Sequence, residues 1–289
     1  MYRTPREGTS APTDLLHDFS LEITGKDADA LSGARAAIPA GTRVHVTYLA
    51  HEDLALRVAA ARTVRRLGLV AVPHVSARRL GSRAELDEFV GGLRADGNAE
   101  HLFLVAGDPR TPAGPFADTL AVIESGVLEH HDVGRVGIAG YPEGHPHIPD
   151  DVLWRALEQK VSALAERGIG ASVTTQFGFD ADRVLGWVEQ VRQRGVAVPV
   201  RVGVPGPAGA RRLLSYATRF GVGTSASIAA KYGLSLTNLM SSAGPDRFVD
   251  ALGAGYDEHR HGELRLHFYT FGGVGATAEW ARGFRQSVG

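Results

Sequence analysis

The amino-acid sequence predicts a single α/β domain folded as a closed (β/α)8 barrel, the TIM barrel. Three observations predict it: short apolar runs occur eight times, segments with helical periodicity separate them, and no linker-like change in composition divides the 289 residues. Strands that alternate with helices favour parallel pairing through right-handed crossovers. Eight such units form a closed barrel of about 250 residues. The polar residues 1–16 are expected to be a flexible lead-in, which leaves residues 17–289 for the barrel.

The expected strands are short runs rich in apolar and β-branched residues. They are residues 19–24, 44–49, 70–75, 101–107, 135–139, 171–177, 198–204 and 264–271. The expected helices carry apolar residues at the 3.6-residue period. They are residues 53–67, 84–93, 116–125, 150–166, 181–194, 208–220 and 276–286, with two more in the long last interval at 226–239 and 247–256.

The composition excludes several classes of partner. With 31 basic and 32 acidic residues, the formal net charge of -1 offers no basic field for nucleic acid or an anionic membrane. The absence of cysteine excludes disulfides and Cys-ligated metals. No apolar run reaches the roughly 18 residues of a transmembrane helix. We therefore expect a cytoplasmic protein without nucleic-acid or membrane partners.

No metal site is expected from the histidine pattern. Adjacent His130 and His131 lie between two acidic residues in a segment that reads as a solvated loop. Other histidine pairs, such as His145 with His147, have no obvious carboxylate at zinc-site spacing.

The ends of the strands carry the candidate chemistry, because barrel active sites lie at that face. Glu22 stands between Leu21 and Ile23, so the alternation of a strand points its carboxylate into the lumen. A buried carboxylate is costly without a partner or a function. We expect burial to raise the pKa of Glu22 toward the range of a general acid.

Three other strand ends also carry candidate residues. Gly107 and Asp108 end the fourth strand, where a glycine allows close approach of a ligand and the aspartate presents a carboxylate. Gln176 precedes an aromatic residue at the sixth strand end and suits a bidentate hydrogen bond to a heterocyclic amide. The fifth strand runs into Gly140-Tyr141-Pro142-Glu143-Gly144-His145-Pro146, a rigid polar loop.

Some strand ends are less specific. Thr47 ends the second strand and is more typical of packing, whereas His74 on the third strand is equally compatible with a core histidine or a ligand contact. Gly272 and Gly273 follow the eighth strand and could cradle a phosphate, as a barrel lyase or aldolase would require. Such an enzyme would also need a lumen lysine for Schiff-base chemistry, and no expected strand carries one.

Seven strand-end motifs together resemble the methylenetetrahydrofolate reductases, in the single-domain bacterial form. They are Phe19-Ser20-Leu21-Glu22, Val46-Thr47-Tyr48, Pro73-His74, Gly107-Asp108-Pro109, Tyr141-Pro142-Glu143-Gly144-His145-Pro146, Thr175-Gln176-Phe177 and Leu266-His267-Phe268-Tyr269-Thr270. They occur in the family's order and extend from about residue 19 to the end of the chain. The resemblance implies a flavoprotein that uses FAD to pass hydride from NADH or NADPH to 5,10-methylenetetrahydrofolate.

The resemblance also implies roles for individual residues. Glu22 would activate the folate toward its iminium form, and Asp108 would lie beside both the flavin and the pterin. Gln176 and Tyr269 would bind the tetrahydrofolate substrate. The positions that match the FAD site are Thr47, His74, Gly107, Asp108, Tyr141, His145 and Lys160.

Four positions depart from the family pattern. The family's arginine, aspartate, asparagine and a second asparagine are replaced here by Ala106, Leu153, Ala156 and Phe271. FAD would therefore have fewer polar anchors, and two alternatives stay open. One is a flavin-independent reductase in which NADH reduces the folate directly, and the other is a non-catalytic barrel that binds folate or flavin. The sequence does not distinguish NADH from NADPH or a homo-oligomer from a monomer. It also leaves open the direction of the reaction, which could be oxidative in one-carbon catabolism.

Overall fold

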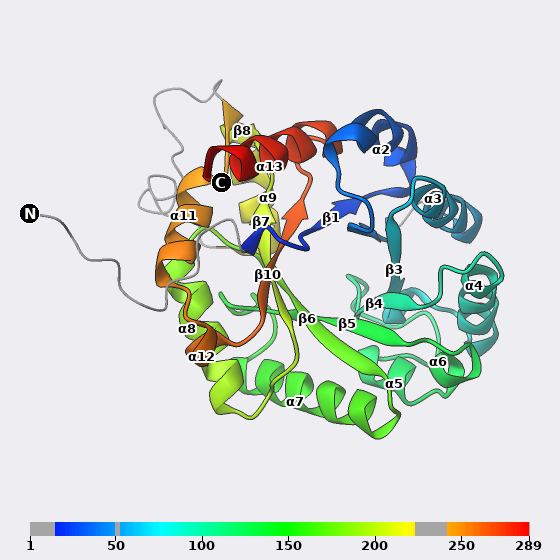
Figure 1. The fold of residues 1–289 in the computed structure, drawn as a ribbon. Coiled ribbons are helices and arrows are strands. Elements are labelled where there is room, and N and C mark those ends of the chain that lie inside the picture. The colour runs from blue at the N-terminus through cyan, green and yellow to red at the C-terminus, as the bar shows by residue number, and fades with distance from the viewer. Residues whose placement is uncertain (1–14, 50–52, 223–241, 289) are drawn as a thin grey trace, which may run out of the picture.

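A computed structural model describes residues 15–49, 53–222 and 242–288 and has the predicted fold (Figure 1). Eight parallel strands close in the order β1-β10-β7-β6-β5-β4-β3-β2. Their bounds are β1 (Ser20–Ile23), β2 (Arg43–Val46), β3 (Val70–Ser76), β4 (His101–Val105), β5 (Arg135–Gly140), β6 (Gly170–Phe177), β7 (Val200–Pro205) and β10 (Leu264–Tyr269). The eight-stranded (β/α)8 barrel predicted from the sequence is confirmed.

The helices form a ring outside the strands (Figure 1). They are α2 (Ala28–Ala34), α3 (Leu54–Arg66), α4 (Arg83–Ala95), α5 (Thr119–Ile123), α6 (Val127–His130), α7 (Asp150–Glu166), α8 (Ala181–Gln193), α9 (Ala210–Phe220), α11 (Asp246–Gly255), α12 (Glu258–His261) and α13 (Val274–Val288). In the described part of the chain, no helix is long and apolar enough to span a bilayer. The expected helix at 226–239 and most of the expected lead-in lie outside the described residues.

Three segments differ from the sequence-based expectation. Helix α2 fills the first interval, for which the sequence pattern gave no specific helix. The expected helix 116–125 is shortened to α5, and a second short helix that was not expected, α6, follows it after Gly126, whose φ of 75° cannot continue a right-handed helix. The expected start of helix 208–220 instead forms β8 (Ala208–Gly209), which pairs with β9 (Ser242–Ala243) before α9 begins.

Strand register brings several polar residues to the same level of the lumen. Glu22 is opposite Tyr269 on one side and His45 on the other, and Ser20 is opposite His267. Residues paired directly across parallel strands point to the same face of the sheet. The alternation that placed Glu22 inside the barrel is therefore repeated by its neighbours on β2 and β10.

An ion network closes the amino-terminal end of the lumen. The carboxylate of Asp18 accepts from Arg43 at 2.6 Å and from Arg201 at 2.7 Å. Although burial favours its protonated form, the two guanidinium groups hold the pKa of Asp18 below its ordinary value. These contacts fill the closed end with paired charges and leave the opposite end for the site.

Candidate active site

Glu22 is the lumen carboxylate that the sequence predicts. Its Oε2 lies 3.8 Å from Nε2 of His74 and 3.7 Å from Nε2 of His267. Its backbone carbonyl accepts a 2.6 Å hydrogen bond from the Thr270 hydroxyl, which joins β1 to the residue after β10. The side chain is 20% exposed, so a ligand at the open end of the barrel can reach it.

The pKa of Glu22 departs from the expected direction. Burial raises this pKa, but the adjacent His267 and His74 imidazoles outweigh burial and lower it overall. The expectation that burial would raise it toward the general-acid range is therefore wrong. Glu22 is a carboxylate at neutral pH and can balance a positive charge that forms on a ligand.

Buried histidines extend from this carboxylate in two directions. His74 is 4% exposed, and its Nε2 is 3.1 Å from Nδ1 of His45. His267 is bonded through Nδ1 to the Ser20 hydroxyl at 2.8 Å. His45 packs between the other two imidazoles, with its ring centroid 4.4 Å from that of His267.

Burial keeps two of these histidines neutral. It lowers the pKa of His74 to about 4, because the opposing attraction of Glu22 is weaker than the loss of hydration. The pKa of His45 is well below its usual value for the same reason, and the neighbouring His267 and His74 lower it further. A neutral imidazole has one donor and one acceptor nitrogen, so His45 and His74 can hydrogen-bond to each other without burying a charge.

Tyr269 and Gln176 lie at the open end of β10 and β6. The Tyr269 hydroxyl donates to the carbonyl of Thr175 at 3.0 Å, and burial raises its pKa well above 10.0. Gln176 occupies a register irregularity between β6 and β7, and its Oε1 accepts from the N–H of Phe177 at 3.1 Å. Gly203 permits this irregularity, because a Cβ there would lie 2.5 Å from the Thr175 carbonyl oxygen.

An aromatic wall adjoins these two residues. Phe271 stacks on Tyr216 of α9 at 4.1 Å between ring centroids, and its edge meets Phe177 at 5.0 Å. Phe220 lies beyond Phe177 at 5.9 Å and is 39% exposed. The wall provides flat apolar surface beside Gln176 for a planar heterocycle. From the sequence, Phe271 was noted only as the replacement of an asparagine, and the wall was not predicted.

Asp108 lies at the surface of the open end, beyond the last residue of β4. Its side chain is 87% exposed, and the cation nearest to it in the ion-pair geometry is Arg79 at 3.5 Å. Gly107 turns the chain here with φ of 91°, and a Cβ at this position would lie 2.2 Å from the Ser76 hydroxyl. The glycine is therefore required by the backbone, whereas the carboxylate is free to meet a ligand that enters the open end.

The loop after β5 begins with a hydrogen-bonded turn. The carbonyl of Tyr141 accepts from Gly144, whose φ is 77°, at 3.0 Å. The rings of Tyr141 and His145 meet edge to face at 5.4 Å. Burial raises the pKa of Tyr141, and burial with the neighbouring His147 lowers that of His145. A protonated phenol and a neutral imidazole are thus presented at neutral pH.

Helix α7 follows this loop and carries Lys160. Burial lowers the pKa of Lys160, although Asp118 at the start of α5 partly opposes the effect. Leu153, one turn into α7, instead lines a cavity of about 340 Å³ between α7 and α8. Stacked Trp154 and Trp187, with ring centroids 5.6 Å apart, also line this cavity.

The residues implied for FAD are divided between two places. Gly107, Asp108, Tyr141, His145 and Thr47 lie at the open end, with the N–H of Thr47 bonded to the Ile23 carbonyl at 2.9 Å. His74 is instead inside the lumen beside His45 and Glu22.

Sequence reasoning missed His45 as a site residue and quoted His267 only within a motif. A signal was present, since His45 alternates with Val44 and Val46 as Glu22 alternates with Leu21 and Ile23. The partners could not be inferred, because they come from strands that meet only when the barrel closes.

Comparisons with known proteins identify the family. The family model described as methylenetetrahydrofolate reductase matches residues 34–277. Methylenetetrahydrofolate reductase 2 of Saccharomyces cerevisiae is 30% identical over 115 residues, which are 36% of this chain and 18% of that protein. The probable methylenetetrahydrofolate reductase (NADH) of Oryza sativa subsp. japonica is 26% identical over 139 residues, 42% of this chain and 22% of its own length. The matches thus span about a fifth of these longer relatives.

A solved structure has the same fold. A protein from Clostridium thermocellum, described as binding two copies of 5-methyl-5,6,7,8-tetrahydrofolic acid, superposes with a TM-score of 0.59 at 10% identity. The match covers 96% of this chain and 100% of the other. The family model extends from helix α2 into helix α13 and so includes seven of the eight barrel strands. The chain belongs to the methylenetetrahydrofolate reductase family.

Proposed function

We propose that this chain reduces 5,10-methylenetetrahydrofolate to 5-methyltetrahydrofolate with NADH or NADPH. The observation that carries the proposal is the Glu22 carboxylate, held in the lumen between two imidazoles at 3.7 and 3.8 Å. Family membership and the folate ligand of the Clostridium thermocellum protein support the same substrate class. The net reaction consumes one hydride and one proton for each folate reduced.

Glu22 has an electrostatic role in this proposal. Opening the five-membered ring of the substrate gives a cationic iminium, and hydride addition to its methylene carbon gives the methyl group. A carboxylate stabilises that cation more than the neutral substrate, which lowers the barrier. His74 and His267, whose Nε2 atoms lie 3.8 and 3.7 Å from Oε2, hold the Glu22 carboxylate in position in the lumen.

Gln176, Tyr269 and Asp108 bind and orient the folate. In this proposal the Gln176 amide hydrogen-bonds the donor–acceptor edge of the pterin, and the aromatic wall, which includes the stacked Tyr216 and Phe271, packs beside the ring. Tyr269 stays protonated at every physiological pH, and because its proton is donated to the Thr175 carbonyl, its oxygen can accept a hydrogen bond from the substrate. Asp108 contacts the pterin from the rim after the ligand enters.

The residues at the rim fit FAD in part. Tyr141 offers a phenol, His145 an imidazole and Lys160 a cation that can pair with a phosphate, and Thr47 with Gly107 completes the set. FAD, when bound, supplies stepwise hydride transfer between the nicotinamide and the folate. Leu153 and Ala156 provide no polar side-chain atom, so we propose that FAD binds weakly and is lost on dilution.

Direct hydride transfer from the nicotinamide is the second candidate route. Leu153 favours it, because this residue faces the cavity shared with Trp154 and Trp187 where the family places an aspartate anchor for the flavin. In this route the same Glu22, Gln176 and Tyr269 act on the folate, and the nicotinamide occupies the rim.

Turnover of purified protein tests both routes. NADH or NADPH oxidation is followed with 5,10-methylenetetrahydrofolate, with and without added FAD, and the visible spectrum reports bound flavin. Folate-dependent oxidation that requires FAD supports the flavin route, and oxidation by colourless protein supports direct transfer. The reverse reaction is assayed with 5-methyltetrahydrofolate and an electron acceptor.

Two outcomes would contradict the proposal. If no nicotinamide oxidation occurs under any of these conditions while calorimetry detects folate binding, the barrel is a binding protein. Glu22→Gln then changes nothing that can be measured as a rate. Absence of both turnover and folate binding would reject the substrate class itself.

A further inference from the structure

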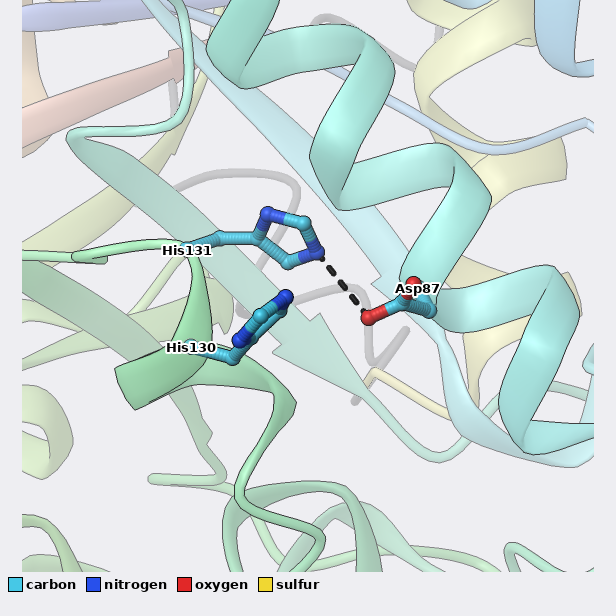
Figure 2. A group of neighbouring side chains, drawn as sticks. All are labelled: Asp87, His130 and His131. Carbon is cyan, nitrogen blue, oxygen red and sulfur yellow. Dashed lines mark hydrogen bonds and ion pairs between the residues drawn. The ribbon is translucent and has the colours of Figure 1, made fainter.

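A cluster outside the barrel lumen brings two histidines to an aspartate of another helix. Figure 2 shows Asp87 on α4 and His130 and His131 at the end of α6 converging on one another. Their possible ligand atoms all lie within 4.8 Å of one another. Nε2 of His131 is 3.1 Å from Oδ1 of Asp87. The segment expected to be a solvated loop is thus a packed helix end with a carboxylate beside it.

Packing fixes the orientation of His131. Its side chain is 11% exposed, and its ring lies over Gly91 of α4, where an added Cβ would be 3.1 Å from the imidazole. The His130 ring meets it at 4.7 Å between centroids with an angle of 72°. The His131 imidazole is therefore positioned before any ligand arrives, which reduces the entropic cost of binding one.

The surrounding charges leave Asp87 as the carboxylate of the cluster. Glu129 is paired with Arg167 at 3.2 Å, and Asp132 is paired with Arg94. Two imidazole nitrogens and one carboxylate oxygen are a ligand set that suits zinc and similar divalent metals, with water in the fourth position. A chain without cysteine offers no thiolate to compete for such an ion.

We propose that Asp87, His130 and His131 bind one divalent transition metal of the zinc class. The metal joins α4 to the end of α6 and so ties the segment between β4 and β5 to the preceding helix. Because it lies outside the lumen and shares no residue with the proposed folate site, it is a stabilising site and does not depend on the reductase proposal.

Cobalt and zinc titrations test the site in untagged protein that has been treated with EDTA. We expect one Co²⁺ per chain with the visible absorption bands of nitrogen and oxygen ligation. Zinc at about 100 times its Kd should raise the Tm by several degrees, since only the folded chain has the three ligands together. Reductase turnover, measured in parallel, should be the same with EDTA or zinc.

Three variants assign the binding to this cluster. Metal affinity should fall by roughly ten-fold or more in each of Asp87→Asn, His130→Gln and His131→Gln, because each substitution removes a ligand. His259→Gln is the matched control, since His259 is an exposed histidine of α12, far from α4 in Figure 1. Circular dichroism checks that each variant is folded.

Two results would overturn the site. One is the absence of a cobalt spectrum together with an unchanged Tm at millimolar zinc. The other is binding that all three cluster variants retain, which would place the metal elsewhere, for example at His145 and His147, whose rings are 6.0 Å apart.

Discussion

The lumen and the rim of this barrel differ in how completely they are built. In the lumen, Glu22, His45, His74 and His267 contact one another and are largely buried. At the rim, the Asp108 side chain is 87% exposed and pairs with Arg79 at 3.5 Å. The titratable groups of the lumen therefore have their partners in the protein, whereas we expect the rim groups to obtain theirs from a ligand.

This difference follows from the cost of burial. A charged or polar group inside a barrel must be paired by the protein itself, or it destabilises the fold. A group at the rim is hydrated and can wait for the ligand at little cost. Substitutions in the lumen should therefore affect both chemistry and stability, and substitutions at the rim should affect binding.

Glu22→Gln should have the largest effect. The amide keeps the size of the side chain but cannot balance the iminium charge, so we expect kcat to fall by about 10²–10⁴-fold. Calorimetry should show folate affinity within a few-fold of the native protein. The measurement is folate-dependent nicotinamide oxidation.

A matched variant separates chemistry from general damage. Glu124→Gln changes an exposed glutamate after α5 and should leave kcat unaltered. If Glu22→Gln retains more than about a tenth of native kcat, the carboxylate is not the group that stabilises the transition state.

The buried histidines should make stability depend on pH. The folded-state pKa of His74 is about 4 against 6.5 in the unfolded chain, so the unfolded chain binds more protons in between. The contribution of neutral His74 to the free energy of unfolding is fully present above pH 6.5 and is lost as the pH falls toward 4. Between pH 7.5 and 5.0, His74 alone should remove about 2 kcal/mol.

Urea unfolding of the native protein and His74→Gln at these two pH values measures that loss. Between these pH values, the free energy of unfolding should fall by about 2 kcal/mol less in the variant than in the native protein. His45, whose pKa is also lowered by burial, should cause part of the pH dependence that the variant retains. Glu22 does not contribute in this window, because its lowered pKa matters only below about 4.5. Equal losses in both proteins would mean that His74 does not stay neutral in the fold.

The sequence predicted local features of the chain better than contacts between residues that are distant in the sequence. All eight strands and the inward direction of Glu22 were predicted and are confirmed, because alternation and periodicity are local properties. The pKa of Glu22 was predicted in the wrong direction, since His74 and His267 approach it only through barrel closure. Asp87 was not linked to His130 and His131 for the same reason, because α4 and α6 meet only in the folded chain.

The missing flavin anchors provide a test of the rim. Leu153→Asp with Ala156→Asn restores the side chains that the family has on α7. If FAD binds there, two added hydrogen bonds of about 1 kcal/mol each should raise its affinity by about 25-fold. Flavin fluorescence quenching measures the affinity, and thermal unfolding checks that a carboxylate beside Trp154 is tolerated. Unchanged affinity would favour direct hydride transfer.

Thr47→Val should have the smallest effect. The substitution removes one hydroxyl and keeps the shape of the side chain, while the backbone N–H of this residue still bonds to the Ile23 carbonyl at 2.9 Å. A neutral hydrogen bond contributes about 1 kcal/mol, so cofactor affinity should fall by about five-fold with no change in Tm. A loss of stability without a loss of affinity would instead make Thr47 a packing residue. Thr47 would then resemble the lumen residues, whose partners come from the protein, and the end of β2 would not be part of the ligand-binding rim.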